Sequence, residues 1–384
     1  MVSELIKLNV KDIVIGGPLP WSIYDRNGTF LIKKGFVIKS ESQVERLLKH
    51  GVFGFASEMV VGKPVEASKA KRSTDFSPFK ILEDVTSQLA ITLANSDNPE
   101  INFTDEIIEL VKDIDRACHR DADAALASLF VIEKGSYPIK HAVDVAVLSG
   151  LMARKRGIIG EAYSSLIAAA LTMNIAMIAL QEILYRQETP LTEEQKKAIY
   201  RHPIEGVKIL RRAKVVDQQW LKYVLTHHEK VDGTGYPNKL PGVQYPDAVQ
   251  LIVLADQYCA RLSPRAYRQP LLHKGILRDI MLDSGKTVDS AIAALFIREL
   301  GFFPPGLIVQ LLNGEVGVVT KRGEKADAPV VHVCTRPGQG NLPRPIQRNT
   351  SLGGNKIRKI LMNDDPNVTF ERRLVWGFNE NSGS

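Results

Sequence analysis

Residues 227–237 of the chain read His-His-Glu-Lys-Val-Asp-Gly-Thr-Gly-Tyr-Pro. The adjacent histidines, His227 and His228, come at the end of an apolar helical stretch, residues 220–225, and point in different directions, as two ligands of one metal site do. The glycines that follow let the backbone turn tightly or approach a bound group closely. We therefore predict a binding site at this helix end, next to the turn that carries Tyr236.

A helical pattern extends well beyond this run. From about residue 78, apolar residues recur at intervals of three and four, which is typical of helices that share one core. Thr192, followed three residues later by Gln195, is a capping-box start. The expected helices are residues 81–93, 107–118, 142–152, 166–180, 192–212, 218–228, 247–262, 273–282 and 288–300.

Segments with β character flank these helices. Alternating or apolar runs at residues 8–15 and 30–38 are separated by turn residues, and short β runs at 316–320 and 330–334 lie between glycine- and proline-rich spacers. The expected fold class is mainly α. The expected domains are a small β-rich N-terminal domain (1–60), a linker (61–77), an all-helical core (78–312) and a β-rich C-terminal extension (313–384).

Composition narrows the class of protein. A chain of 384 residues with 44% hydrophobic content can form two or three units with a sizeable core. Cys118, Cys259 and Cys334 lie far apart, so neither a disulfide framework nor a zinc knuckle is indicated, and a cytoplasmic location fits. The N-terminus lacks a signal-peptide pattern. The longest apolar run, residues 166–180, is shorter than the about 20 residues that span a bilayer, so we expect a buried helix and no membrane span.

The net charge of +7 is unevenly distributed. Residues 321–384 hold 11 Lys and Arg against 6 Asp and Glu. A basic tail can meet nucleic acid, but aromatic residues are not interleaved with these cations. We interpret the tail as a solvated basic surface and expect no nucleic-acid partner.

The run at 227–237 resembles the signature of the HD-GYP family, the metal-dependent phosphodiesterases that hydrolyse the bacterial second messenger cyclic di-GMP. The resemblance covers about residues 120–300 and implies that the helical core is of the HD type. Within it, the positions that match the family's metal ligands are His141, His202 in the step His202-Pro203, the pair His227 and His228, and Asp256.

The His-Asp pair that gives the family its name has no counterpart here. By the resemblance, Met173 stands for the histidine, Asn174 for the bridging aspartate, and Met177 for a lysine three residues on. Methionine is a weak ligand for hard or borderline ions, and asparagine brings no charge to offset two dications. The resemblance therefore implies a degenerate member in which a two-metal site, and hydrolysis with it, is not expected.

A smaller metal site remains open. By the family's pattern His202, His227 and His228 hold one ion together with the lost aspartate, and three histidines with an open position can hold one divalent transition metal such as Fe, Mn or Zn. Each histidine could instead be a satisfied core side chain. His141 and Asp256, the remaining ligands of the second ion, could simply hydrogen-bond to each other.

The resemblance also implies a ligand-binding shell. Arg265 and Arg268 match two basic residues that contact the dinucleotide, and Tyr236 and Asp232 are further candidates around the site. Arginine suits both phosphates and guanines. Cys259 stands where the family often has another aspartate. The alternative is a solvated, arginine-rich helix end.

The metal-activating positions are thus replaced while the nucleotide-binding positions largely remain. We expect a catalytically impaired protein of bacterial second-messenger signalling, which binds cyclic di-GMP or a partner protein such as a diguanylate cyclase domain. Two alternatives stay open: an active metal-dependent cyclic di-GMP phosphodiesterase with an unusual site, and a protein-interaction scaffold that binds no nucleotide. The flanking β units could be regulatory or could form a homodimer.

Overall fold

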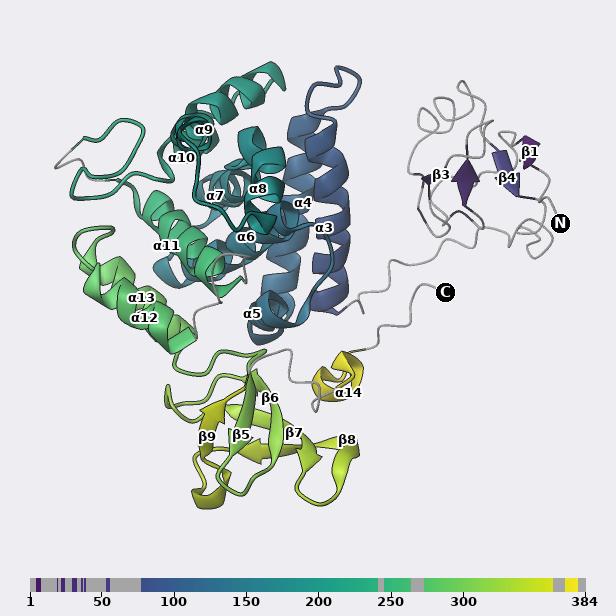
Figure 1. Cartoon of the computed structure of the whole chain (residues 1–384), viewed down its shortest axis with the longest axis vertical. Coiled ribbons are helices and arrows are strands. Elements are labelled where there is room, and N and C mark those ends of the chain that lie inside the picture. Colours follow the sequence, from purple (N-terminus) through teal and green to yellow (C-terminus); the bar gives the residue numbers. More distant parts are fainter. Residues whose placement is uncertain are drawn as a thin grey trace. The chain divides into compact units, whose positions relative to one another are not determined.

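The computed structural model divides into two compact units, Met1–Phe76 with Asn379–Ser384, and Ser77–Phe378 (Figure 1). It describes residues 77–240, 245–263, 273–361 and 370–378, and from the first 76 residues only 5–7, 19, 22–24, 30–32, 36, 38 and 53–55. The described part of the first unit forms an antiparallel sheet of strand order β1-β4-β2-β3. Its strands are β1 (Leu5–Lys7), β2 (Ile23–Tyr24), β3 (Phe30–Ile32) and β4 (Phe53–Phe55).

The second unit is mainly helical, which confirms the predicted fold class. A helix that the sequence did not predict, α5, follows α4 after a single residue, Asp121, whose carboxylate caps the new helix through the backbone N–H groups of Asp123 and Ala124. The long helices are α3 (Pro78–Ala94), α4 (Phe103–Arg120), α5 (Ala122–Val131), α6 (Tyr137–Arg156), α7 (Gly160–Thr172), α8 (Ile178–Arg186), α9 (Glu193–Arg212), α10 (Gln218–Thr226), α11 (Asp247–Leu262), α12 (His273–Leu282) and α13 (Ser290–Leu300).

Helix α6 lies at the centre of this unit, between α3 and α4 on one side and α11 on the other (Figure 1). Every residue from His141 to Ala153 is buried, so the helix is enclosed on all its faces. The capping box at the start of α9 is confirmed: the Thr192 hydroxyl accepts from the Gln195 N–H, and the Gln195 side chain accepts from the Thr192 N–H. Burial holds α6, which carries His141, and the capping box defines the start of α9, which carries His202.

The prediction of a single helix over residues 166–180 is wrong. α7 ends at Thr172, a 3-10 turn spans Ile175–Met177, and α8 begins at Ile178. Asn174 leaves helical geometry, as asparagine tends to do, and its carbonyl accepts from the Met177 N–H. The Thr172 hydroxyl is held by a hydrogen bond from the Trp220 indole on α10, at 2.7 Å. The helix therefore breaks at Met173 and Asn174, the two positions that the sequence interpretation matched to a His-Asp pair.

The segment Gly160–Arg186 is long and apolar enough to cross a membrane when judged by length and composition alone. It is broken at residue 173 and most of its apolar window, 61%, is buried inside the helical unit. These are the properties of a core helix, which is how the sequence was interpreted.

A five-stranded antiparallel sheet of order β8-β7-β6-β5-β9 follows the helices (Figure 1). Its first strand begins at Ile308, inside the range 78–312 that the sequence assigned to the helical core. Phe303, Leu307 and five inward-facing strand residues form its own apolar core. The strands are β5 (Ile308–Leu311), β6 (Val316–Lys321), β7 (Val330–Arg336), β8 (Gly340–Asn349) and β9 (Ile357–Ile360), and a short helix, α14 (Arg372–Trp376), follows them.

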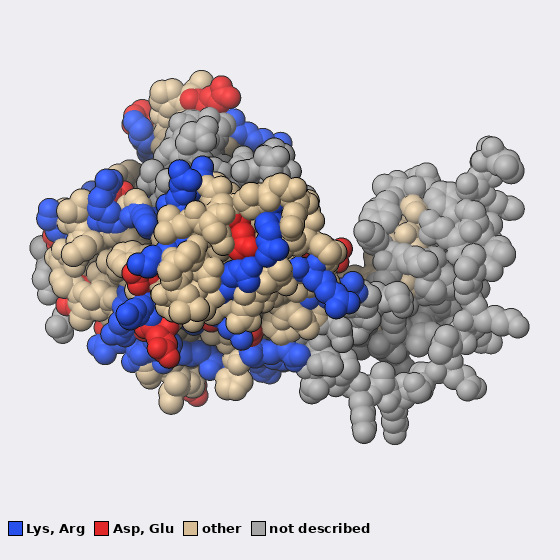
Figure 2. Space-filling view, turned by 90° about the horizontal axis from the view of Figure 1, so that it is seen from below, with Lys and Arg blue, Asp and Glu red and all other residues tan. Residues whose placement is uncertain are grey.

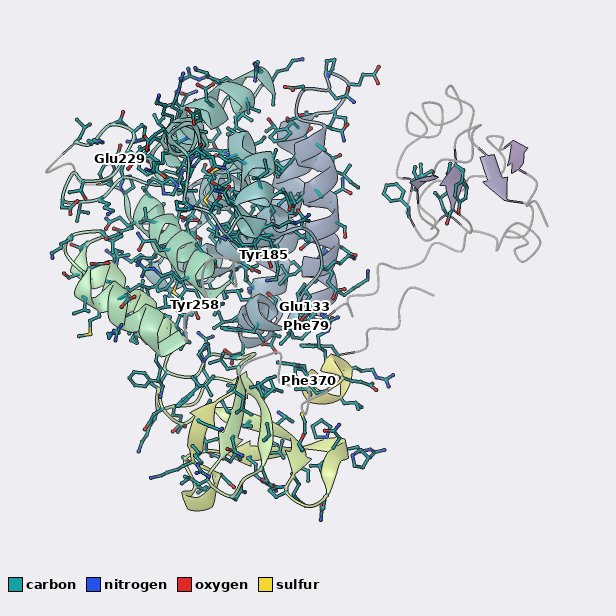
Figure 3. The ribbon with its side chains drawn as sticks, in the orientation of Figure 1. Phe79, Glu133, Tyr185, Glu229, Tyr258 and Phe370 are labelled. Carbon is teal, nitrogen blue, oxygen red and sulfur yellow. The ribbon has the colours of Figure 1, made fainter. Side chains whose placement is uncertain are left out.

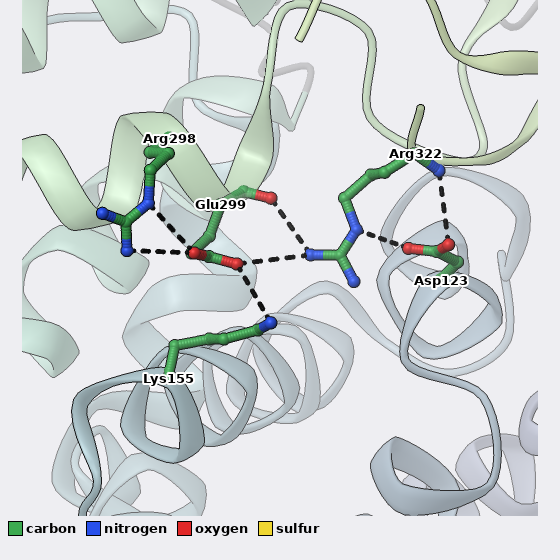
Figure 4. Close-up of polar contacts among 5 residues, drawn as sticks. All are labelled: Asp123, Lys155, Arg298, Glu299 and Arg322. Atoms are coloured by element: carbon green, nitrogen blue, oxygen red, sulfur yellow. Dashed lines mark hydrogen bonds and ion pairs between the residues drawn. The ribbon is translucent and has the colours of Figure 1, made fainter. Parts of the chain in front are cut away.

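A chain of ion pairs joins the sheet to the helices (Figure 4). Arg322, directly after β6, donates to the Asp123 carboxylate at the start of α5 and, at 3.2 Å, to the Glu299 carbonyl of α13. Lys155 of α6 lies 3.6 Å from the Glu299 carboxylate. On the face drawn in Figure 2, Lys and Arg are scattered among uncharged residues and interleaved with Asp and Glu.

Candidate metal centre

Three histidines from two helix segments come together in the second unit. His202 lies on α9, His227 directly follows the last residue of α10, and His228 comes next. One ring nitrogen from each lies within 4.8 Å of the others. The Nε2 atoms of His202 and His227 are 3.1 Å apart. The three residues that the sequence grouped as ligands of one ion are thus adjacent in space.

The proline after His202 explains how that imidazole is oriented. Pro203 has no N–H, so it leaves the carbonyl of Ile199, four residues earlier, without its usual helical donor. The Nδ1 atom of His202 lies 2.6 Å from that carbonyl and takes the vacant place. This hydrogen bond assigns the proton to Nδ1 and leaves the Nε2 lone pair free to face His227.

His227 is oriented in the same way, by a carbonyl at the end of α10 that has no helical donor. α10 ends at Thr226, so the Val224 carbonyl is among the last carbonyls of the helix and has no helical donor. The Nδ1 atom of His227 lies 2.7 Å from it. Both Nε2 atoms are then acceptors, and two lone pairs at 3.1 Å repel each other unless a cation lies between them. Two imidazoles on one tetrahedral Zn²⁺ place their nitrogens about 3.3 Å apart, so the donor set fits a metal ion.

Electrostatics favour neutral imidazoles in this cluster. Burial and the neighbouring His227 lower the pKa of His202 to about 3. Burial also lowers the pKa of His227, and it lowers the pKa of His228 well below the usual range. Neutral rings at neutral pH have the unprotonated nitrogens that a metal ion requires.

His141 and Asp256 lie beside the three histidines and are paired. His141 on α6 and Asp256 on α11 meet at 2.8 Å, from Nε2 to Oδ1. Burial alone would raise the pKa of Asp256, but this hydrogen bond and the nearby imidazoles hold it below its ordinary value. The Nδ1 atom of His141 is buried and has no partner among the described residues. The hydrogen bond that the sequence interpretation allowed between these two residues is therefore present.

Met173 and Asn174 are buried in the turn between α7 and α8. The backbone of this turn lies against α9: a Cβ built at Gly206, four residues after His202, would be 3.7 Å from the Met173 carbonyl. Met177 ends the 3-10 turn. The two residues thus occupy a buried position beside the helix that carries His202.

The glycine-rich turn folds back on the backbone of the histidine cluster. Gly235 has no room for a side chain, because a Cβ there would be 2.5 Å from the His228 carbonyl. The Tyr236 N–H donates to that same carbonyl at 3.1 Å, and the Tyr236 ring stacks on the imidazole of His228 with centroids 4.6 Å apart. Tyr236 therefore covers one side of the histidine cluster.

Glu229 is a buried residue beside the cluster whose role in holding the turn the sequence did not reveal. It is 2% exposed, and its carboxylate accepts hydrogen bonds from the N–H groups of Asn238, at 2.6 Å, and Lys239, at 3.3 Å. Figure 3 shows it at the end of the helical unit near α9 and α10, away from the C-terminal sheet. Glu229 thus ties the end of the turn to its beginning. The sequence signal for this role was the acidic residue placed directly after two histidines.

The remaining residues singled out in the sequence differ in their surroundings, and two of them are not described by the structure. The exposed Asp232 uses its carboxylate within the turn, where it accepts from the N–H and hydroxyl of Thr234 at 2.9 and 2.7 Å. Arg265 and Arg268 lie outside the described residues. Cys259 is buried, and burial raises the pKa of its thiol well above the usual range.

A cavity of about 200 Å³ opens beside the cluster. His228 and Asp256, two of the candidate ligands, line it, and Tyr200 and Tyr236, whose ring centroids are 4.8 Å apart, form an aromatic side of it. Its other lining residues are Lys230, Thr234, Gly235, Lys239, Val253 and Gln257.

The chain is similar in sequence to known proteins. Residues 128–292 match the family model of the HD domain. A cyclic di-GMP phosphodiesterase from Pseudomonas aeruginosa is 26% identical over 272 residues, which cover 70% of this chain and 63% of that protein. The cyclic di-GMP phosphodiesterase PdeB from Borreliella burgdorferi is 25% identical over 232 residues, which cover 59% and 60%. The chain thus spans about three-fifths of the length of these relatives.

Solved structures contain the same fold. An HDG"Y"P protein from Bdellovibrio bacteriovorus matches 77% of this chain and 99% of its own, with a TM-score of 0.51 and 18% sequence identity. At this level of identity the match speaks for the fold.

Proposed function

The chain belongs to the HD-GYP family, and from this premise we propose that it is a catalytically impaired member that binds cyclic di-GMP without hydrolysing it at a rate typical of the family. The observation that carries the proposal is the buried pair Met173 and Asn174 beside the helix of His202. A thioether and a neutral amide supply neither the imidazole nor the negative charge that two adjacent dications need.

We propose that one divalent transition metal, Fe, Mn or Zn, is held by His202, His227 and His228. When bound, such an ion can polarise a phosphoryl oxygen or activate a water molecule. The protein's own contribution is orientation: Ile199 and Val224 fix two of the three imidazoles through their carbonyls. His141 and Asp256 are hydrogen-bonded to each other, and a second ion is not part of the proposal.

The ligand side of the proposal rests on the cavity. Tyr236 presents its ring there, and Arg265 and Arg268 are the residues that we propose for guanine or phosphate contacts. Asp232 remains a proposed member of this shell. Binding would take place in the cytoplasm, with a signalling protein such as a diguanylate cyclase domain, or a second copy of the chain, as the receiver of the signal.

One other function is favoured by a specific observation. The similar proteins from Pseudomonas aeruginosa and Borreliella burgdorferi are named as cyclic di-GMP phosphodiesterases, which supports an active metal-dependent phosphodiesterase with an unusual site. A scaffold that binds neither metal nor nucleotide is the third reading.

One experiment separates the three. Calorimetric titration with cyclic di-GMP is combined with elemental analysis and with chromatography of the nucleotide after incubation with Mn²⁺ or Fe²⁺. Binding of intact cyclic di-GMP supports the sensor. Accumulation of linear dinucleotide, abolished by His227→Ala, would establish the enzyme instead. The absence of both metal and binding, up to high micromolar ligand, would leave the scaffold.

A further inference from the structure

Two lysines face the cavity beside the histidine cluster. Lys230 follows Glu229 in the turn, and Lys239 comes two residues after Pro237, so the two lie at opposite ends of the same loop. His228 and Asp256 line the same cavity. The only carboxylate among the lining residues, that of Asp256, is already paired with His141.

Neither lysine forms an ion pair within 4.0 Å in the part of the chain that the structure describes. Other lysines of this unit do, such as Lys140 with Asp144 and Lys208 with Glu205. The two acids of this loop are engaged by other groups: the Asp232 carboxylate, which also feels the charge of Lys230, accepts from Thr234, and the Glu229 carboxylate accepts from backbone N–H groups. Two ammonium groups at one small cavity therefore have no ion-pair partner among the residues that the structure describes.

The backbone of Lys239 provides a second, independent observation. Its φ is 55°, in the left-handed region, where glycine is favoured and a lysine costs free energy. The buried Glu229 carboxylate holds this conformation by accepting the Lys239 N–H. The hydrogen bond to Glu229 thus fixes the backbone from which the Lys239 side chain extends, and Lys239 is one of the residues that line the cavity.

We infer that Lys230 and Lys239 form an anion-binding wall that receives a phosphate group of the nucleotide. This rests on the proposed function and names the subsite within it. A cavity of about 200 Å³ is small beside the roughly 300–1,000 Å³ typical of sites that enclose a whole ligand, so it takes one phosphate and its sugar. The tyrosine pair, Tyr200 and Tyr236, lies against the less polar part of that ligand.

The sharpest test uses the two lysines with positive φ. Lys214, just after α9, has a φ of 63° and does not line the cavity, so Lys214→Gly is matched to Lys239→Gly. Both changes remove left-handed strain, and neither should lower the melting temperature. Only Lys239→Gly should weaken cyclic di-GMP binding, by about fivefold, and Lys239→Arg should restore it.

Adding Lys230→Ala to Lys239→Gly should weaken binding by about 25-fold and flatten the dependence of affinity on salt. Lys222→Ala, on the exposed side of α10, is the charge control. Unchanged affinity and unchanged salt dependence in the double variant would overturn the inference while leaving the proposed function intact.

A separate probe covers the case in which wild-type protein binds no cyclic di-GMP. Millimolar inorganic phosphate should then raise the melting temperature of the wild type and of Lys214→Gly, but not of the Lys230→Ala/Lys239→Gly variant. An equal rise in all three proteins would overturn the lysine wall. The titration with cyclic di-GMP thus tests the proposed function, and the titration with phosphate tests the lysine site independently.

Discussion

The Nε2 atoms of His202 and His227 face each other at 3.1 Å, while each ring uses its Nδ1 atom on a backbone carbonyl. The carbonyls are free for different reasons, one because Pro203 cannot donate and the other because α10 ends. Two neutral imidazoles are thereby aimed at one point, which suits a cation better than a shared proton.

Metal content follows from this geometry. We expect at most one Fe, Mn or Zn per chain, and we expect His202→Ala or His227→Ala to remove it, because each change takes one of three ligands. His119→Ala, at an exposed histidine outside the cluster, should keep the metal. Inductively coupled plasma mass spectrometry provides the measurement. Two ions per chain would contradict the prediction and would bring the Asn174 amide, or a carboxylate not yet assigned, into the site.

Introducing a His-Asp pair at positions 173 and 174 should restore the hydrolysis of cyclic di-GMP. Wild-type protein is expected to hydrolyse cyclic di-GMP far more slowly than its family does. Met173→His combined with Asn174→Asp should raise the rate with Mn²⁺ or Fe²⁺ by at least about a hundredfold, since a bridging charge then offsets two ions. Chromatography of the linear product measures this, and adding His227→Ala should abolish the gain. Fast hydrolysis by the unmodified chain would be the opposite result.

Ligand binding should depend on two arginines that follow α11. Each of Arg265 and Arg268 is predicted to make a charge-assisted contact worth about 1.5–3 kcal/mol. Replacing both by alanine should lower the affinity for cyclic di-GMP at least about a hundredfold. Arg278→Ala, on the exposed face of α12, is the matched control. Equal calorimetric affinities of the double variant and the wild type would exclude these contacts.

The sequence predicted helix bounds where apolar periodicity is strong, and it predicted candidate site residues where a family pattern is present. Periodic apolar residues located α11 and α12 to the residue, and the family pattern grouped His202, His227 and His228 before their contact was seen. The break at residue 173 was missed, because the apolar run continues through it and the contacts of the turn with α9 and α10 cannot be seen in the sequence. The role of Glu229 was missed because its partners are backbone N–H groups nine and ten residues later.

The glycine of the Gly-Tyr-Pro turn offers a test of how the cluster is held. Gly235→Ala should destabilise the turn, because its new methyl group would meet the His228 carbonyl at 2.5 Å and the Lys230 nitrogen at 2.5 Å. We expect a loss of about 2–3 kcal/mol in the free energy of unfolding, together with loss of bound metal. Gly354→Ala, where a Cβ meets nothing within 4 Å, should change neither. Denaturant unfolding and metal analysis of both variants decide the matter.

The C-terminal sheet contains a buried acid whose partners come from two other strands. The Glu315 carboxylate accepts hydrogen bonds from Arg348 of β8, at 2.9 and 3.0 Å, and from Arg336 of β7, at 2.9 Å. Together with Asn313, these donors lower its pKa to about 2. Because the folded-state pKa is depressed below the ordinary value near 4.3, the stabilisation is complete above that value and is lost as the pH falls toward 2.

Glu315→Gln should therefore destabilise the protein most at neutral pH. A shift of this size corresponds to about 3 kcal/mol, and removing the charge also leaves two arginines without their anion. Denaturant unfolding of wild type and variant, at pH 7 and again near pH 2.5, should give a difference that is large at neutral pH and small in acid. The exposed Glu324→Gln should show no such trend. A difference that stays constant across this pH range would mean that Glu315 stabilises the sheet by packing and neutral hydrogen bonds, and that its charge contributes nothing.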